Sequence, residues 1–105
     1  MESNRLNKVT SLIKNLAAEF IQKESGGGSM ITITNADISK DLKNSTIYIS
    51  VLPESAEEKA LNFTKRQRAD FRDFVKANTD LRIVPFFDFK IDLGEKHRQR
   101  IEEIS

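Results

Sequence analysis

The sequence has 105 residues, which is enough for one compact domain and too few for two. Its 17 basic and 16 acidic residues nearly cancel, so binding to nucleic acid would require local clusters of charge. The chain has no cysteine, which excludes disulfides, thiolate catalysis and zinc sites built on cysteine. No apolar run approaches the length of about 20 residues that spans a bilayer, and the N-terminus lacks the pattern of a secretory signal. We therefore expect residues 1–105 to form one cytoplasmic, monomeric domain without membrane contact.

Residues 4–24 are predicted to form an amphipathic helix, because apolar side chains recur there every three or four positions. These side chains are Leu6, Val9, Leu12, Ile13, Leu16, Phe20 and Ile21. The following segment, residues 25–29, contains three of the four glycines and two serines, which predicts a flexible loop.

Two strands joined as a hairpin are expected next. The first runs from Ile31 to Ile38, and a change in the phase of its apolar alternation predicts a bulge near Asn35. The second covers residues 46–51, where apolar and polar side chains alternate strictly. The polar connection between them, residues 39–44, is short enough for an antiparallel hairpin.

A second long helix is predicted after Pro53. Ser55 and Glu58 have the spacing of a capping box, with Ser55 as the N-cap residue. The apolar stripe of this helix almost disappears over residues 64–70, so the helix is either exposed or bent there. It is expected to end near Asn78.

A third strand is predicted from Leu81 to Asp92, and Pro85 within it favours an edge position or a local break in pairing. Gly94 leads into a short terminal helix. This order of elements predicts an α+β fold of two layers, in which helices cover one face of a three-stranded sheet. The strand residues expected in the core are Ile31, Ile33, Ile47, Ile49, Val51, Ile83, Phe87 and Phe89.

The densest basic stretch coincides with the gap in the apolar stripe of the second helix. Its members are Lys65, Arg66, Arg68, Arg72 and Lys76. They could bind RNA phosphates, or they could form a solvated helix face with ion pairs such as Arg66–Asp70. A second, weaker basic set consists of Arg5 and Lys8 on the first helix and Lys40 and Lys43 in the hairpin.

Other residues offer little chemistry. Tyr48 could stack on a base, but partial packing beneath a loop or tail is the favoured interpretation, because single exposed aromatic residues are ordinary. Asp41 is expected to bond its own backbone, as aspartates in turns do. His97 is the only histidine and has no neighbouring nucleophile and acid in the sequence. We expect no enzyme activity, no cofactor, no metal and no small-molecule substrate, and the sequence has no glycine-rich phosphate loop.

Several of these segments resemble the ribosome-binding factor A family. Ser39 to Leu42 followed by Thr46 to Leu52 is similar to the first-hairpin motif of the family. Leu81 to Pro85, with Phe89 and Asp92 behind it, is similar to the last-strand motif, and Arg5 and Val9 also fit. Together these segments cover the chain from residue 4 to residue 104 in the expected order.

The resemblance implies a type II KH-like domain, α-β-β-α(kinked)-β with a short C-terminal helix and a mixed sheet whose third strand is parallel to the first. It also implies a ribosome assembly factor that binds the small (30S) ribosomal subunit and its 16S rRNA and assists late maturation. The two basic sets are then the expected RNA-binding residues. The alternative function is a protein-interaction domain that uses a sheet edge or the acidic terminal helix, with Glu102 and Glu103, and contacts no RNA.

The chain departs from the family pattern in two places. Where the family usually has Ala-x-Gly at the helix kink, this chain has Gln67-Arg68-Ala69 and therefore no glycine. Where the family commonly has an Asp-Pro-Arg-like segment, this chain has Ser25 to Ser29.

Overall fold

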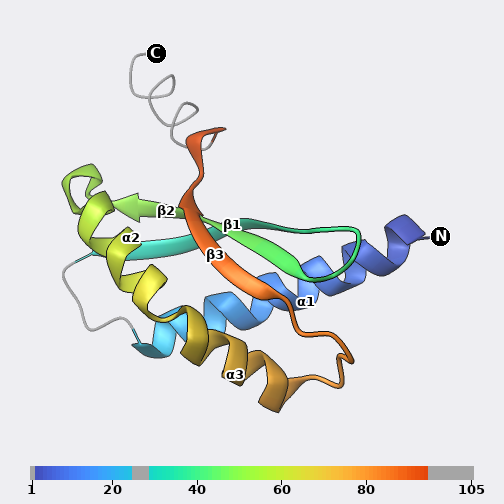
Figure 1. Ribbon diagram of the computed structural model, residues 1–105. Helices are drawn as coiled ribbons and strands as arrows, with labels where there is room; N and C mark the ends of the chain where they lie inside the picture. The colour runs from blue at the N-terminus through green and yellow to red at the C-terminus, as the bar shows by residue number, and fades with distance from the viewer. Residues whose placement is uncertain (1, 25–28, 95–105) are drawn as a thin grey trace.

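The computed structural model describes residues 2–24 and 29–94, so the predicted terminal helix with His97, and all but the last residue of the glycine-rich loop, lie outside the described residues. The elements follow the order α1 (Glu2–Glu24), β1 (Met30–Ile38), β2 (Asn44–Leu52), η1 (Glu54–Ala56), α2 (Glu57–Arg66), α3 (Arg68–Asn78) and β3 (Phe86–Ile91). The helices pack against one face of a three-stranded sheet, which confirms the α+β fold of two layers (Figure 1). None of the described helices is long and apolar enough to cross a membrane.

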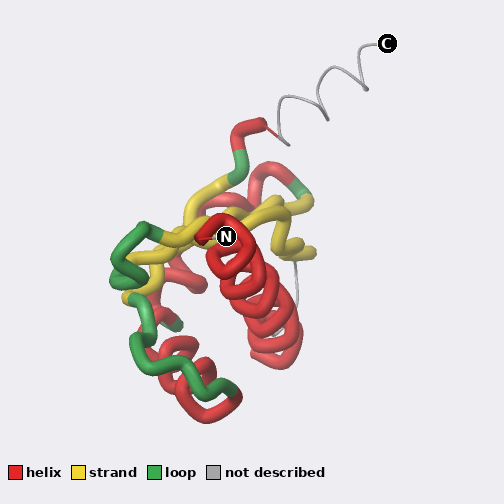
Figure 2. The backbone as a smooth tube through the Cα atoms, turned by 90° about the vertical axis from the view of Figure 1, so that its right-hand side faces the viewer, coloured by secondary structure: helices red, strands yellow, loops and turns green. Residues whose placement is uncertain are grey.

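The long helix α1 forms where its apolar periodicity predicts it and lies along the sheet (Figure 2). The buried side chains of α1 follow three- and four-residue spacing, as a helix packed on one side requires. They are Ile13, Leu16, Ala17, Phe20 and Ile21. Leu12 is exposed although the sequence placed it among the apolar residues of the helix, because it lies at the margin of this stripe.

The strands are ordered β1-β2-β3, with β2 in the centre. β1 and β2 pair antiparallel, and their register shifts between Ile33 and Asn35, which confirms the predicted bulge. β3 pairs with β2 in parallel, so the sheet is mixed as expected. The expectation that the third strand is parallel to the first was wrong, because β3 is parallel to β2 and β2 is antiparallel to β1. The helical connection from β2 to β3 is the crossover that a parallel pair requires.

The third strand is shorter than its alternating sequence predicted. It begins at Phe86, whose N–H donates to the Lys43 carbonyl at 2.8 Å. Pro85, immediately before it, has no N–H with which to continue the ladder. Ile83 is therefore in a loop and 45% exposed, and its predicted place in the core was wrong. The edge position that Pro85 favoured is confirmed.

The core is centred on Phe71 of α3, which is fully buried. Its ring centroid lies 5.4 Å from that of Phe20 on α1 and 4.7 and 6.1 Å from those of Phe87 and Phe89 on β3. These contacts join both layers of the fold. Of the strand residues expected in the core, Ile47, Ile49, Val51, Phe87 and Phe89 are buried, and Ile31 and Ile33 are partly buried against them.

The predicted capping box does not form. Ser55 lies inside the 3-10 turn η1, and the N-cap residue of α2 is Ala56, which makes no side-chain capping bond. The Ala56 N–H donates to the Pro53 carbonyl at 2.9 Å, which closes a tighter turn than an α-helical start. The capping residue therefore falls one position later than the sequence pattern indicated.

Candidate nucleic-acid interface

The second long helix is interrupted at Gln67, between α2 and α3. Gln67 has φ −91° and ψ 4°, a conformation open to residues other than glycine, so the bend forms without the glycine usual in the family. The Gln67 N–H bonds the Thr64 carbonyl at 3.0 Å, and its carbonyl accepts the Phe71 N–H at 2.8 Å. The gap in the apolar stripe therefore marks a bend in the helix.

Asp88 on β3 contacts cations from both sides of this bend. Its Oδ1 lies 2.8 Å from Nζ of Lys65, at the end of α2, and 3.5 Å from Nη1 of Arg68, at the start of α3. Arg68 also donates from Nε to the Lys65 carbonyl at 2.9 Å. One carboxylate thus stands against two cations, and the cluster keeps a net charge of +1 on a partly exposed surface.

The pKa of Asp88 is lower than usual for an aspartate. Partial burial acts to raise this pKa, but the hydrogen bonds from Lys65 Nζ and the Phe89 N–H, with the charges of Lys65 and Arg68, outweigh it. The carboxylate is therefore ionised at neutral pH.

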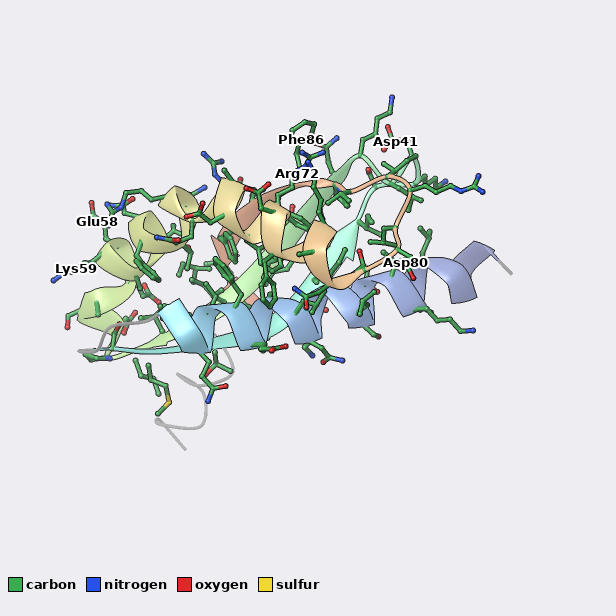
Figure 3. The ribbon with its side chains drawn as sticks, turned by 90° about the horizontal axis from the view of Figure 1, so that it is seen from below. Asp41, Glu58, Lys59, Arg72, Asp80 and Phe86 are labelled. Carbon is green, nitrogen blue, oxygen red and sulfur yellow. The ribbon has the colours of Figure 1, made fainter. Side chains whose placement is uncertain are left out.

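Arg72 on α3 is engaged with the chain that leads into β3. Its Nε donates to the Pro85 carbonyl at 3.1 Å, and its Nη2 donates to the Val84 carbonyl at 3.0 Å. Its guanidinium carbon lies 4.4 Å from the centroid of the Phe86 ring, close enough for a cation–π contact. Figure 3 shows the two side chains next to each other.

The hairpin loop between β1 and β2 lies beside this arginine and phenylalanine, because Phe86 pairs with Asn44 in the parallel ladder. Lys40 and Lys43 are exposed in this loop. Asp41 accepts hydrogen bonds from the Ser39 hydroxyl and the Lys43 N–H, and these bonds lower its pKa. The expectation that Asp41 bonds its own backbone is confirmed.

The predicted basic residues therefore fall into two groups. Lys65, Arg68 and Arg72 are held by ion pairs or hydrogen bonds to the fold. Arg66 and Lys76 are exposed, and no ion pair of either appears in residues 2–24 and 29–94, so the Arg66–Asp70 pair of the solvated-face alternative is absent there. The exposed cations of the second set are Lys8, Lys40 and Lys43, and the side chain of Arg5 lies outside the described part of the chain.

Tyr48 is half-buried on the sheet, and its hydroxyl donates to Asp37 Oδ2 at 3.1 Å. This hydrogen bond raises the pKa of Tyr48. The contact favours the packing interpretation of Tyr48 over stacking on a base. In the described ranges, no three side chains of His, Cys, Asp or Glu gather as a metal site would require.

Sequence reasoning missed two residues of this surface. Asp88 appeared only as a polar position in an alternating strand, and its cationic partners are 20 and 23 residues away. Phe86 was not singled out as a site residue; strand alternation turns it away from Phe87 and Phe89, and it is 65% exposed. An aromatic residue on the polar face of an edge strand was the available signal for Phe86.

The chain is similar to known proteins of one family. The family model for ribosome-binding factor A matches residues 5–105. Ribosome-binding factor A of Fervidobacterium nodosum is 32% identical over 77 residues, which cover 72% of this chain and 62% of that relative. The crystal structure of ribosome-binding factor A from Thermus thermophilus superposes with a TM-score of 0.72 at 22% identity, over 82% of this chain and 94% of that one. A homology model of the Thermus thermophilus protein, fitted into the cryo-EM map of its complex with the 30S subunit, gives a TM-score of 0.68 at 23% identity, over 77% and 88% of the two chains.

Proposed function

The chain belongs to the ribosome-binding factor A family, and from that premise we propose that it binds the small ribosomal subunit and contacts its rRNA. Its role would be to assist late maturation of the subunit. It would act as a cytoplasmic monomer and would catalyse no reaction itself. The observation that carries this proposal is the family match over residues 5–105, which spans nearly the whole chain.

The charge distribution supports a contact with RNA backbone. The stretch from Lys65 to Lys76 contributes five cations and two anions, and Asp88 adds one further anion opposite them. The difference of five and three leaves a local charge of +2 in a chain whose net charge is only +1. Lys and Arg side chains neutralise phosphates and fix the orientation of a protein on RNA without reading its sequence.

Two kinds of basic residue would share this role. Arg66 and Lys76 are exposed and could approach phosphate directly, as could Lys40 and Lys43 in the hairpin. Lys65, Arg68 and Arg72 first support the fold and would meet phosphate with the donors that remain. Arg5 and Lys8 on α1 belong to the proposed interface as its outlying members.

Sedimentation of the full chain with purified ribosomal subunits tests this proposal. We expect the protein to pellet with small subunits and to stay in the supernatant with large subunits at the same concentration. Immature small subunits, isolated from a strain in which their assembly is slowed, should retain at least as much protein as mature ones. Failure to pellet with either small-subunit preparation would contradict the proposed function.

Salt dependence distinguishes rRNA contact from a purely protein-mediated contact. Each phosphate contact contributes about 0.9 to the slope of log affinity against log salt on duplex nucleic acid and about 0.7 on a single strand. Five or so cationic contacts should therefore give a slope of roughly −3 to −5. A slope near zero would favour the interaction-domain alternative.

A further inference from the structure

We propose that Phe86 is a stacking platform for one unpaired nucleobase, with Arg72 and Lys43 contacting the neighbouring phosphates. The proposal rests on the proposed function, since it assigns one contact within the RNA interface. It gives a binding role to Phe86, which is neither a core phenylalanine nor one of the basic residues. The aromatic ring, not a charge, would make the contact with the base.

Phe86 is 65% exposed, whereas Phe87 and Phe89 in the same strand are buried. Leaving an aromatic side chain of this size in water forgoes the favourable free energy of burying it, and the outward position in the strand gives it no packing role in the core. Arg72 covers one face of the ring, so the opposite face accounts for much of the exposed surface.

The Phe86 ring is held in place by its surroundings. The Phe86 N–H bonds the Lys43 carbonyl at 2.8 Å, and the residue is the first of a parallel ladder with β2. Arg72 is fixed in turn by the Val84 and Pro85 carbonyls, so the guanidinium cannot leave the ring without breaking two hydrogen bonds. A ring fixed in this way loses little conformational entropy when a base stacks on it.

The groups around the ring favour an anionic partner. Exposed apolar groups usually bind apolar partners, but Arg72 covers one face of this ring, and the Phe86 backbone bonds the hairpin loop that carries the exposed Lys40 and Lys43. Asp41 in the same loop is occupied by hydrogen bonds within that loop. An aromatic face bordered by cations matches a single-stranded nucleotide, whose base presents a π-face and whose phosphates are anionic. Bases within a duplex are already stacked, so a duplex would not use the ring.

The chain contains no tryptophan, so Phe86→Trp introduces a single indole fluorophore at the platform. Single-stranded RNA of about ten nucleotides should quench its fluorescence, with the same midpoint as binding measured by anisotropy of labelled RNA. A duplex of the same sequence should quench it much less. Leu52→Trp is the matched control, because Leu52 is 50% exposed at the other end of β2. Equal quenching at both positions would contradict the proposal.

Phe86→Leu keeps an apolar side chain and removes the π-face. We expect it to lower the affinity for single-stranded RNA at least about fivefold, while Phe86→Trp restores it. The salt slope should stay unchanged, because stacking releases no counterions. Unchanged affinity would overturn the proposal, and so would weaker binding to intact subunits with unchanged binding to free RNA, which would indicate a ribosomal protein as the partner of the ring.

The two proposals fail in distinguishable ways. If the unmodified chain pellets with small subunits and Phe86→Leu binds both subunits and RNA equally well, the platform is excluded and the proposed function stands. If the unmodified chain does not bind small subunits, the proposed function fails, and the quenching experiment with free RNA still decides whether the platform exists.

Discussion

Lys65 and Asp88 form an ion pair of 2.8 Å that joins the end of α2 to the middle of the edge strand β3. Because Arg68 approaches the same carboxylate from the other side of Gln67, the pair also fixes the bend between the two helices. The cations nearest to the bend therefore serve the fold before they serve any ligand. Substitutions at this surface can therefore change the stability of the fold, the binding of a ligand, or both.

Asp88→Asn should strengthen binding to small subunits at low salt. The change removes the anion that occupies Lys65 and Arg68 but keeps an oxygen that can accept the Phe89 N–H. The magnitude of the salt slope should grow by about one unit, measured by sedimentation at several salt concentrations. Stability should fall by no more than about 1 kcal/mol, since the pair is partly exposed. Asp80→Asn removes the same charge from the loop after α3 (Figure 3), and an equal gain there would assign the effect to net charge alone.

Acid should destabilise the domain partly through Asp88. A carboxyl group whose pKa is lowered by folding stabilises the folded state above its unfolded pKa, and this contribution is lost as pH falls through the lowered value. The melting temperature should therefore decrease from about pH 4 downwards. Asp88→Asn should show a smaller decrease, although Asp41 with its lowered pKa will still contribute. Identical pH profiles for the two proteins would contradict the assignment to Asp88.

Arg66→Ala combined with Lys76→Ala should weaken subunit binding with little effect on folding. Both side chains are exposed and make no ion pair among the described residues. The free energy of unfolding should therefore change by less than about 0.5 kcal/mol. The salt slope should become flatter by about one to two units. Lys59→Ala, at the far end of α2, is the control and should leave the slope unchanged. A double variant that binds as the unmodified protein would return these residues to a solvated helix face.

Arg72→Lys should destabilise the segment that leads into β3 although the charge is kept. A lysine ammonium cannot reproduce the planar fork that bonds the Val84 and Pro85 carbonyls together. We expect a loss of about 1 kcal/mol in denaturant unfolding. Amide hydrogen exchange should also become faster at Phe86, next to the released carbonyls. Wild-type stability with weaker RNA binding would show that Arg72 acts on the ligand alone.

Phe71→Ala should cost about 3–5 kcal/mol of unfolding free energy, because Phe71 is fully buried and touches rings from α1 and β3. Phe74→Ala should cost less, since Phe74 is only partly buried at the edge of this cluster. Tyr48→Ala on the sheet should cost least of the three. Chemical denaturation of the variants checks this order, and an equal loss for Phe71 and Tyr48 would contradict the assigned core.

Local patterns predicted most of the fold. The apolar periodicity of α1, the bulge near Asn35, the hairpin and the alternation of β2 depend on neighbouring residues, and all are present. The failures arose where tertiary contacts decide. Ser55 does not cap the helix, because a turn closed by the Pro53 carbonyl takes in Ser55. The strand expected from Leu81 begins only after Pro85.

The candidate site was less predictable than the fold. The sequence identified the basic stretch but not which cations are engaged, because the partners are distant in the chain. Lys65 and Arg68 depend on Asp88, and Arg72 depends on carbonyls that become available only when the strand starts at Phe86. Backbone acceptors of this kind leave no trace in residue types. The parallel pairing of β3 with β2 likewise could not be derived from the strand sequences themselves.

The conformation of Gln67 has a consequence for substitution at the bend. With φ at −91°, the position imposes no left-handed backbone, so residues other than glycine can occupy it. Mutational tolerance at residue 67 should therefore be broad. The constraint falls instead on Thr64, which is fully buried and whose hydroxyl bonds the Leu61 carbonyl at 2.8 Å. A sequence pattern for bent helices of this type that requires glycine at the break would therefore miss this chain.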